Sequence, residues 1–397
     1  MSLTTLNIRL QSMAIFRALL QDPVVSALSA YLESLEQTSL SASVSKYAAF
    51  VSSLYGSGNR TLAGYIQHIV NNDENAYIRM IGKGAQPWEE MDADVWAELE
   101  ILQAVADLTP EALRQVLDWN GYLPGFAVKQ LNLAESYRER CANIHQYGYG
   151  MYAKHRMFYI NAENRIVPVH NPDKTQLSSL IDYKREQQII LDNTIALLEG
   201  KPAANILLTG DAGTGKSSTV KAVVNELAHR GLRILEVRKE QLTVIPAILD
   251  ELNTNPLKFI LFIDDLSFQK DDDNFSALKA ILEGSVSAKS RNVVIYATSN
   301  RRHLVKESFS NRDGDDVHRN DTMQEIISLS ERFGIQVTFQ KPDKKTYLGI
   351  VHHLAREKGV QMEDSELDML AERYALGRGG RSARAATQFI DGLLAKQ

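Results

Sequence analysis

A glycine-rich stretch in the middle of the chain ends in a lysine and a serine. It reads Gly-Asp-Ala-Gly-Thr-Gly-Lys-Ser over residues 210–217 and continues with a second serine. Glycines let such a loop curl until successive backbone N–H groups converge on phosphate oxygens, and the amino end of a following helix adds partial positive charge. The lysine then reaches the β- and γ-phosphates, and the serine after it can ligate Mg²⁺. We therefore predict that a nucleoside triphosphate contacts Gly210, Asp211, Ala212, Gly213, Thr214, Gly215, Lys216, Ser217 and Ser218, with Ser217 also a ligand of Mg²⁺.

The segments that flank this loop favour that interpretation over a glycine-rich turn that binds nothing. An apolar run over residues 205–209 reads as a buried strand, and residues 218–227 read as a helix. A phosphate-binding loop has to lie between a strand and a helix in this way.

Two further apolar runs also end in polar side chains. Residues 259–263 lead into Asp264 and Asp265, and residues 292–297 lead into Thr-Ser and then Asn300. In an open parallel sheet, ligands gather at the carboxyl ends of the strands. We therefore expect Asp264 to hold Mg²⁺ and Asp265 to orient an attacking water. Asn300 is expected to bond the γ-phosphate or that water, while a solvated acid pair and a structural turn are the alternatives.

The order of the apolar segments predicts an α/β fold. From about residue 178, strand-like and helix-like segments alternate, which is typical of a parallel sheet covered by helices on both faces. The predicted strands are residues 205–209, 233–238, 258–264, 292–297 and 335–340. We predict a five-stranded parallel sheet in a core over residues 178–341, followed by a small helical lid over 342–397.

The first part of the chain, residues 1–158, is predicted to be a mainly α-helical domain. Asp22-Pro23 and Thr109-Pro110 have the pattern of a helix cap followed by proline in the first turn. A linker is placed at 159–177, with β-prone residues at 157–160 and 165–169. The three tryptophans of the chain, Trp88, Trp96 and Trp119, are assigned to the core of this domain in preference to a recognition role.

Composition narrows the class of protein. The chain has 397 residues, a net charge of −5 and one cysteine, so we expect two or three domains and no intrachain disulfide. The negative charge gives no support to nucleic-acid binding, although Arg301, Arg302, His303 and Lys306 form a local basic cluster. No apolar run is long enough to span a membrane. We therefore expect a cytoplasmic protein without a membrane partner.

Taken together, these segments resemble an AAA+ ATPase module. The loop, the strand ending in two acids, the strand ending in Thr-Ser-Asn and the Glu-Arg-Phe-Gly of residues 331–334 carry the resemblance. It implies that Asn300 is sensor 1 and that Arg332 is an arginine finger acting on ATP bound by a neighbouring subunit. Arg381 and Arg384 both fit a sensor 2 motif, and Arg381 is preferred. Each arginine could instead be a surface salt-bridge residue. The resemblance further implies Mg²⁺ and ATP as ligands and a homo-oligomer, either a ring or an open assembly.

A narrower resemblance covers most of residues 130–397. Motifs at 181–183, 262–268, 296–304, 328–334 and 380–382, together with the glycine-rich loop, are similar to an uncharacterised bacterial AAA+ family, domain of unknown function 815. Membership implies a bacterial cytoplasmic setting and places the segment around Tyr183 beside the adenine pocket. It implies no substrate.

One departure concerns Asp265, where most AAA+ hydrolases carry glutamate. Aspartate is one methylene shorter, which withdraws the carboxylate by roughly 1 Å. Because hydrolysis depends on positioning and electrostatics, we expect slow turnover. Replacing Asp265 by glutamate is then expected to raise kcat or leave it unchanged.

Several functions remain open at this point. The sequence lacks the Asn-Lys-x-Asp of a GTPase and the Leu-Ser-Gly-Gly of an ABC transporter ATPase, and a small-molecule kinase is a minor alternative. The segment 239–246 after the second strand has no aromatic residue, which disfavours a threading unfoldase. We expect an ATPase that remodels or loads a partner, with the N-terminal helices as a protein-binding domain. A nucleic-acid remodeller or loader and a non-hydrolysing, nucleotide-switched scaffold are the alternatives.

Overall fold

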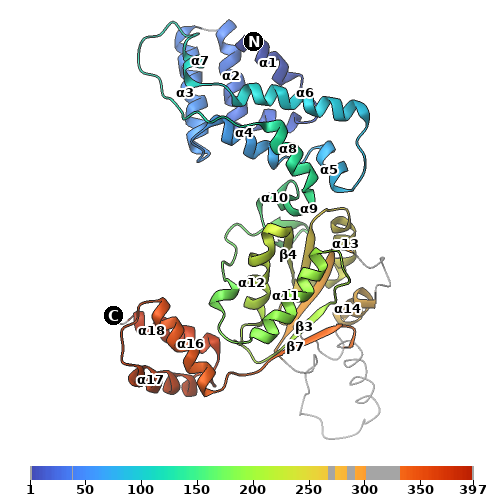
Figure 1. Ribbon diagram of the computed structural model, residues 1–397, viewed down its shortest axis with the longest axis vertical. Coiled ribbons are helices and arrows are strands. Elements are labelled where there is room, and N and C mark those ends of the chain that lie inside the picture. Colours follow the sequence, from blue (N-terminus) through green and yellow to red (C-terminus); the bar gives the residue numbers. More distant parts are fainter. Residues whose placement is uncertain (1, 38, 267–272, 284–290, 301–330, 396–397) are drawn as a thin grey trace. The chain divides into compact units, whose positions relative to one another are not determined.

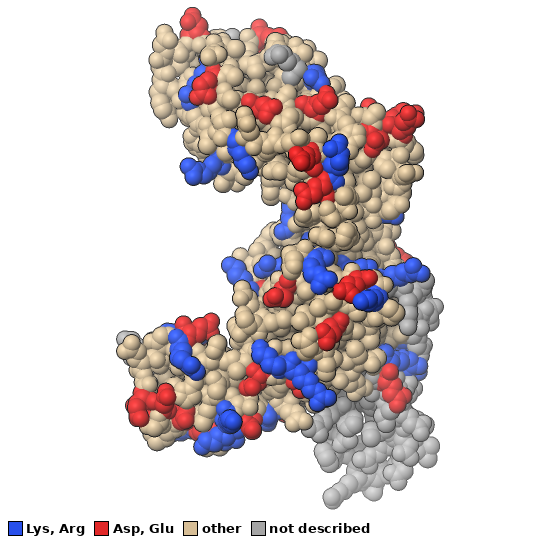
Figure 2. Space-filling model, in the orientation of Figure 1, with Lys and Arg blue, Asp and Glu red and all other residues tan. Residues whose placement is uncertain are grey.

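The computed structural model describes residues 2–37, 39–266, 273–283, 291–300 and 331–395. The chain divides into two compact units, Met1–Lys154 and His155–Gln397 (Figure 1). On the face shown in Figure 2, basic and acidic side chains are interspersed over both units. Among the described residues, no helix combines the length and the apolar character that crossing a membrane requires.

The first unit is helical, as the sequence predicts. Asp22 and Thr109 cap helices that open with proline: the Asp22 carboxylate accepts the N–H of Val24 at 2.9 Å, and the Thr109 hydroxyl accepts the N–H of Ala112 at 3.2 Å. The helices are α1 (Leu3–Gln11), η1 (Arg17–Gln21), α2 (Pro23–Gln37), α3 (Leu40–Gly56), α4 (Leu62–Asn71), α5 (Ala76–Gly82), α6 (Glu89–Ala106), α7 (Pro110–Arg114), α8 (Leu133–Ala142), α9 (Ile144–Tyr147) and α10 (Met151–Lys154).

The placement of two tryptophans corrects the prediction that all three are core residues. Trp88 is 64% exposed and Trp119 is 47% exposed, whereas Trp96 is partly buried against the core ring of Tyr137. Trp88 immediately precedes α6, and Trp119 lies in the irregular segment after α7, so neither is on the buried face of a helix. The ring of Trp119 instead covers Gly121, where an added Cβ would come within 2.3 Å of it.

The second unit is built on a mostly parallel sheet with the strand order β2-β1-β4-β5-β6-β3-β7. The five predicted strands are β3 (Ile206–Gly210), β4 (Leu232–Val237), β5 (Lys258–Ile263), β6 (Val293–Ser299) and β7 (Ile335–Phe339). All their mutual pairings are parallel, and most of their residues are buried. These near-continuous apolar runs are what a sheet covered on both faces requires.

The sheet has seven strands, not the predicted five, because β1 (Met157–Ile160) and β2 (Ile166–Pro168) extend it. β1 pairs in parallel with β4 and antiparallel with β2. This corrects the prediction of a linker at 159–177, since most of the β-prone residues there belong to the sheet. The hairpin turn is closed locally: the Asn161 side chain accepts the N–H groups of Glu163 and Arg165 at 3.1 and 2.8 Å.

Helices cover both faces of the sheet, which confirms the predicted α/β class. α11 (Lys184–Leu198) and α12 (Lys216–Leu227) share a buried core with one face of the strands, and α13 (Ile245–Asn253) contacts β6. The remaining elements of this part are η2 (Leu177–Ser179), η3 (Ala228–Arg230), η4 (Lys239–Val244) and α14 (Asp273–Glu283).

After β7 the chain forms a three-helix lid. α16 (Lys344–Glu357), α17 (Asp364–Gly377) and α18 (Ala383–Leu394) enclose their own apolar core. Asp343 and Ser382 cap α16 and α18 by accepting backbone N–H groups at 2.8 and 3.1 Å. Ile181, just before α11, also packs on the lid core.

Candidate nucleotide site at the carboxyl edge of the sheet

The glycine-rich loop joins β3 to α12 in a conformation that depends on its glycines. Gly213 and Gly215 have φ of 79° and 93°, a region that other residues rarely adopt, and Gly215 is the cap of α12. A Cβ at Gly210 would come within 2.0 Å of the carbonyl oxygen of Phe339 on the neighbouring β7. The Thr214 hydroxyl closes the loop by donating to the Asp211 carbonyl oxygen at 2.9 Å. The loop is therefore a compact, curled connection at the amino end of a helix.

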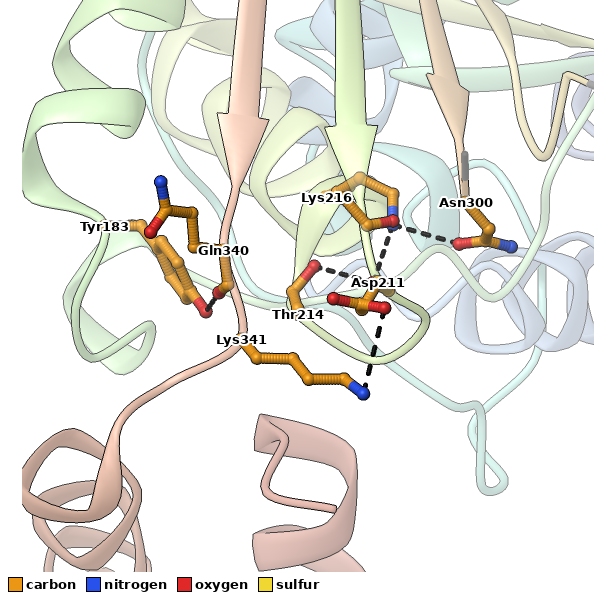
Figure 3. Close-up of polar contacts among 8 residues, drawn as sticks. Tyr183, Asp211, Thr214, Lys216, Asn300, Gln340 and Lys341 are labelled. Atoms are coloured by element: carbon orange, nitrogen blue, oxygen red, sulfur yellow. Dashed lines mark hydrogen bonds and ion pairs between the residues drawn. The ribbon is translucent and has the colours of Figure 1, made fainter. Parts of the chain in front are cut away.

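The Lys216 ammonium is folded back over this loop (Figure 3). Its Nζ donates to the carbonyl oxygens of Gly210 and Asp211 at 2.8 and 2.9 Å, and to the Asn300 side-chain oxygen at 3.0 Å. Burial lowers the pKa of Lys216 from its usual 10.5, and the nearby carboxylates of Asp264 and Asp211 oppose that effect. The charge is held by neutral oxygens that a phosphate could replace.

Ser217 and Asp264 meet where the loop faces the end of β5. The Ser217 hydroxyl donates to an Asp264 carboxylate oxygen at 2.6 Å, and the Thr298 hydroxyl at the end of β6 donates to the same oxygen at 2.5 Å. A hydroxyl and a carboxylate are oxygen ligands of the kind Mg²⁺ prefers, and Mg²⁺ usually keeps waters and substrate phosphates as its other ligands. The pair fits this ion. Consistent with so sparse a ligand set, no group of three or more His, Cys, Asp or Glu that could hold a metal is found within the described residues.

Asn300 connects the ammonium to the second aspartate. Its amide nitrogen donates to Asp265 at 2.7 Å, while its oxygen accepts from Lys216. Asp265 has a φ of 54°, and its N–H donates to the Thr298 hydroxyl at 2.9 Å. Asp and Asn tolerate this left-handed conformation better than glutamate does. The backbone therefore supplies a reason for the aspartate at this position.

Tyr183 lies on the other side of the loop, beside the end of β7 (Figure 3). Its ring packs on Phe339 with 5.0 Å between centroids, and its hydroxyl donates to the Gln340 carbonyl oxygen. Burial raises the pKa of Tyr183 to about 12. Lys341, which follows Gln340, forms an ion pair of 3.8 Å with Asp211 in the loop. No motif in the sequence indicates Lys341, because a lysine in a connection between a strand and a helix has many possible roles.

The two lid arginines have different surroundings. Arg381 forms two hydrogen bonds with Glu372 of the lid, at 2.8 and 2.7 Å, which engage its guanidinium inside the lid. Arg384 lies at the start of α18, and its N–H donates to the Gly213 carbonyl oxygen at 3.3 Å. A Cβ at Gly213 would lie 3.0 Å from the Arg384 Cβ. The geometry thus favours Arg384 and departs from the sequence preference for Arg381.

Not all predicted site residues come together in this cluster. Arg332 precedes β7, whose Ile335 pairs with Ile206 at the amino end of β3, so it lies at the opposite edge of the sheet from the loop. Ala212 lies within the loop and Ser218 in the first turn of α12. The basic cluster Arg301, Arg302, His303 and Lys306 lies outside the described residues.

The fold is that of an AAA+ P-loop module, with the glycine-rich loop between β3 and α12. The chain belongs to the family described as "Protein of unknown function (DUF815)", which matches residues 153–397. A search of curated proteins finds no match to the chain.

Solved structures similar to the chain include Thermotoga maritima RuvB, titled a Holliday junction branch migration motor. The match has 19% identity and a TM-score of 0.36, and covers 55% of this chain and 63% of that chain. Two substituted forms of the same protein match at 19% and 18% identity, with TM-scores of 0.38 and 0.37 and the same coverage. The chain thus spans less than two thirds of these structures, and likenesses this distant carry no function across.

Proposed function

We propose that the chain binds ATP with Mg²⁺ and hydrolyses it to ADP and phosphate. The observation that carries the proposal is the continuous set of bonds from Lys216 through Asn300 to Asp265, beside the Ser217–Asp264 pair. Three neighbouring strands of the sheet, β3, β6 and β5, bring these side chains to one edge. A cation, an oriented carboxylate and a hard-metal pair are the parts that phosphoryl transfer to water needs.

Each side chain has a defined task in this proposal. Lys216 exchanges its loop and Asn300 acceptors for phosphate oxygens of the triphosphate. Asp265 orients the attacking water, and Asn300 fixes the Asp265 carboxylate and contacts the water or the γ-phosphate. Ser217 and Asp264 would hold Mg²⁺, which supplies charge neutralisation on the phosphates when bound. Turnover is proposed to be slow, because the aspartate carboxylate is shorter than that of glutamate and the left-handed backbone at this position disfavours the longer residue.

The nucleotide is proposed to extend from the loop toward the lid. The segment at Tyr183, which packs on β7 next to the loop, borders the adenine, and Arg384 approaches the phosphates from α18. Support for Arg384 comes from its backbone bond to Gly213 and from its influence on the Lys216 pKa.

Hydrolysis is proposed to occur between copies of the chain in a homo-oligomer. β7 rises about 3.3 Å per residue, so its length separates Arg332 from the loop of its own chain. An arginine at that edge is too far from the loop of its own chain to contact a phosphate bound there. Arg332 is therefore proposed as the arginine finger of a neighbouring subunit.

The chain is proposed to use the energy of hydrolysis to remodel or load a protein partner in the cytoplasm. The N-terminal helical unit is proposed to bind that partner. The interspersed charges of Figure 2 offer no single-sign surface for nucleic acid on the face shown. A DNA loader and a non-hydrolysing scaffold remain as outcomes of the tests.

The test compares binding with turnover in the full chain. Calorimetry with Mg-ATP should show binding that Lys216→Ala weakens at least about 100-fold, while circular dichroism stays unchanged. Asp265→Asn should keep the affinity and reduce phosphate release by about 100-fold or more, the range of a lost general base. Asn adopts a left-handed φ readily, so this variant keeps the local backbone. Absence of binding heat would overturn the proposal, and binding with equal, negligible turnover in both proteins would assign a scaffold.

A further inference from the structure

The lid carries a cavity that the nucleotide site does not use. It has a volume of about 520 Å³ and lies between α17 and α18. Its lining comes from one face of each helix, because residues 370, 373, 374 and 377 on α17, and 389, 392 and 393 on α18, follow helical spacing. The lining consists of Leu370, Arg373, Tyr374, Gly377, Arg378, Phe389, Gly392 and Leu393.

The floor of the cavity is apolar. The rings of Tyr374 and Phe389 pack with 5.7 Å between centroids, and Phe389 is 6% exposed. On α17, Met369 and Leu376 each come one residue before a lining residue, and they are 63% and 80% exposed. An exposed Leu alone needs no explanation, but apolar side chains beside a concave apolar lining are typical of binding sites.

Two helical glycines leave the cavity open. A Cβ added at Gly377 or Gly392 would meet no atom within 4 Å. No close packing therefore requires a glycine at either position. Gly392 lies within α18, where glycine is less favourable than alanine. Because Gly377 and Gly392 have no side chains, they leave the volume of the cavity open.

The cavity also has a basic rim. Arg373 and Arg378 are exposed, and the Arg378 guanidinium lies 5.4 Å from the centre of the Tyr374 ring. In the described part of the chain, neither guanidinium lies within ion-pair distance of a carboxylate.

The nearby lid carboxylates already have other partners. Glu372 bonds Arg381, Asp368 bonds His352 at 2.7 Å, and Asp391 pairs with Lys358. The two arginines of the rim are therefore left as uncompensated positive charge beside an apolar cavity.

We propose that this lid cavity is a docking site for a partner protein, which inserts a large apolar side chain flanked by Asp or Glu. The volume accommodates an aromatic or leucine anchor, and a desolvated anchor of this kind carries much of the affinity at interfaces. The flanking carboxylates would form charge-assisted bonds with Arg373 and Arg378. The aliphatic part of the lining favours a protein anchor over a nucleic-acid base. This inference does not depend on the proposed hydrolysis.

The test selects from random 12-residue peptides displayed on phage, using the full chain. Recovered peptides are then synthesised, and their affinities are measured by fluorescence anisotropy. Gly392→Leu places a side chain in the cavity with a good helix former, and Gly349→Leu is the matched control. Gly349 lies on α16, does not line the cavity, and also has nothing within 4 Å of an added Cβ.

We expect peptides that share a bulky apolar residue beside two or more Asp or Glu. Their affinity should fall at least about tenfold with Gly392→Leu, and again with Arg373→Ala or Arg378→Ala, and change less than about twofold with Gly349→Leu. The charge reversal Arg378→Glu, at the C-cap of α17, provides a second test and should weaken these peptides further, because it repels their carboxylates.

Three results would overturn the proposal. Peptides that bind Gly392→Leu as well as the natural chain would exclude the cavity, as would the recovery of no peptide. Basic or neutral motifs, or a 20-nucleotide DNA that competes with the peptides, would exclude an acidic protein segment. Self-association that Gly392→Leu abolishes, measured by sedimentation, would assign the cavity to a second copy of the chain.

Discussion

The side-chain amide of Asn300 donates a hydrogen bond of 2.7 Å to the carboxylate of Asp265. Asn300 directly follows β6, and Asp265 follows the neighbouring strand β5. Because the amide is neutral, it orients the carboxylate without adding charge. The left-handed backbone conformation of Asp265, with a φ of 54°, also determines where this carboxylate lies. The position of this carboxylate therefore depends on both its length and its backbone conformation.

Lengthening the Asp265 side chain is expected to slow ATP hydrolysis, in contrast to the expectation from side-chain length alone. The shorter carboxylate alone predicts that Asp265→Glu raises kcat or leaves it unchanged, but glutamate is strained at a φ of 54° and would extend past Asn300. We expect kcat to fall about tenfold, equivalent to about 1.4 kcal/mol, with unchanged ATP affinity. Phosphate release under saturating ATP measures the effect. A higher kcat would show that side-chain length dominates.

Nucleotide affinity should depend on pH through Lys216. Burial holds its pKa below 10.5, and phosphate oxygens would raise it again by stabilising the ammonium. Between these two values binding takes up a proton, so affinity falls as pH rises through the lowered pKa and is constant below it. Calorimetry over a series of pH values below 10.5, in two buffers of different ionisation enthalpy, measures the uptake. Lys216→Arg, which stays charged, should show no such proton uptake; an equal slope in both proteins would assign it elsewhere.

The two lid arginines should separate in their effects. Arg384→Ala is expected to weaken ATP binding about tenfold, since a charge-assisted bond to phosphate is lost. Arg381→Ala should leave affinity within about twofold and lower the thermal stability of the lid, because Glu372 loses two hydrogen bonds. Titration calorimetry and thermal unfolding of both variants provide the comparison. The opposite pattern would restore the preference for Arg381.

A buried carboxylate should control the stability of the N-terminal unit. Glu98 is 6% exposed, and its oxygens accept the N–H groups of Ala14, Ile15 and Phe16 at 2.6 to 3.1 Å. Glu98→Ala leaves these donors without their acceptor and is expected to cost about 3 kcal/mol. Glu100→Ala, at an exposed position of the same helix, should cost less than about 0.5 kcal/mol.

Urea unfolding followed by tryptophan fluorescence measures this effect. All three tryptophans of the chain lie in the first unit, so their signal reports on that unit. Equal midpoints for the two variants would contradict the role assigned to Glu98.

The parts of the molecule that the sequence could predict depend on local patterns. The loop at 210–217 follows an apolar run and combines glycines with a lysine and a serine. Asp264 and Asn300 are polar residues directly after apolar runs. Both patterns are typical of ligand-binding positions in a parallel sheet. The sequence predicts a linker over 159–177, where β2 and the second half of β1 lie, because both strands are short and β1 pairs with β4 about 75 residues further along the chain. Pairing at that distance leaves no mark on local composition.

Side-chain environment was harder to predict than secondary structure. Trp88 and Trp119 are hydrophobic, but their exposure depends on where α6 begins and α7 ends. The choice between Arg381 and Arg384 depended in the same way on the start of α18 and on a carboxylate in another helix. Motif spacing alone contains neither fact.

The outer hairpin of the sheet also limits how copies of the chain can join. β2 has only three residues and ends in Pro168, which has no N–H to offer a further strand. Natural proteins use short, proline-containing margins to prevent one sheet from adding to another. Copies of the chain are therefore not expected to join by continuing the backbone ladder past β2.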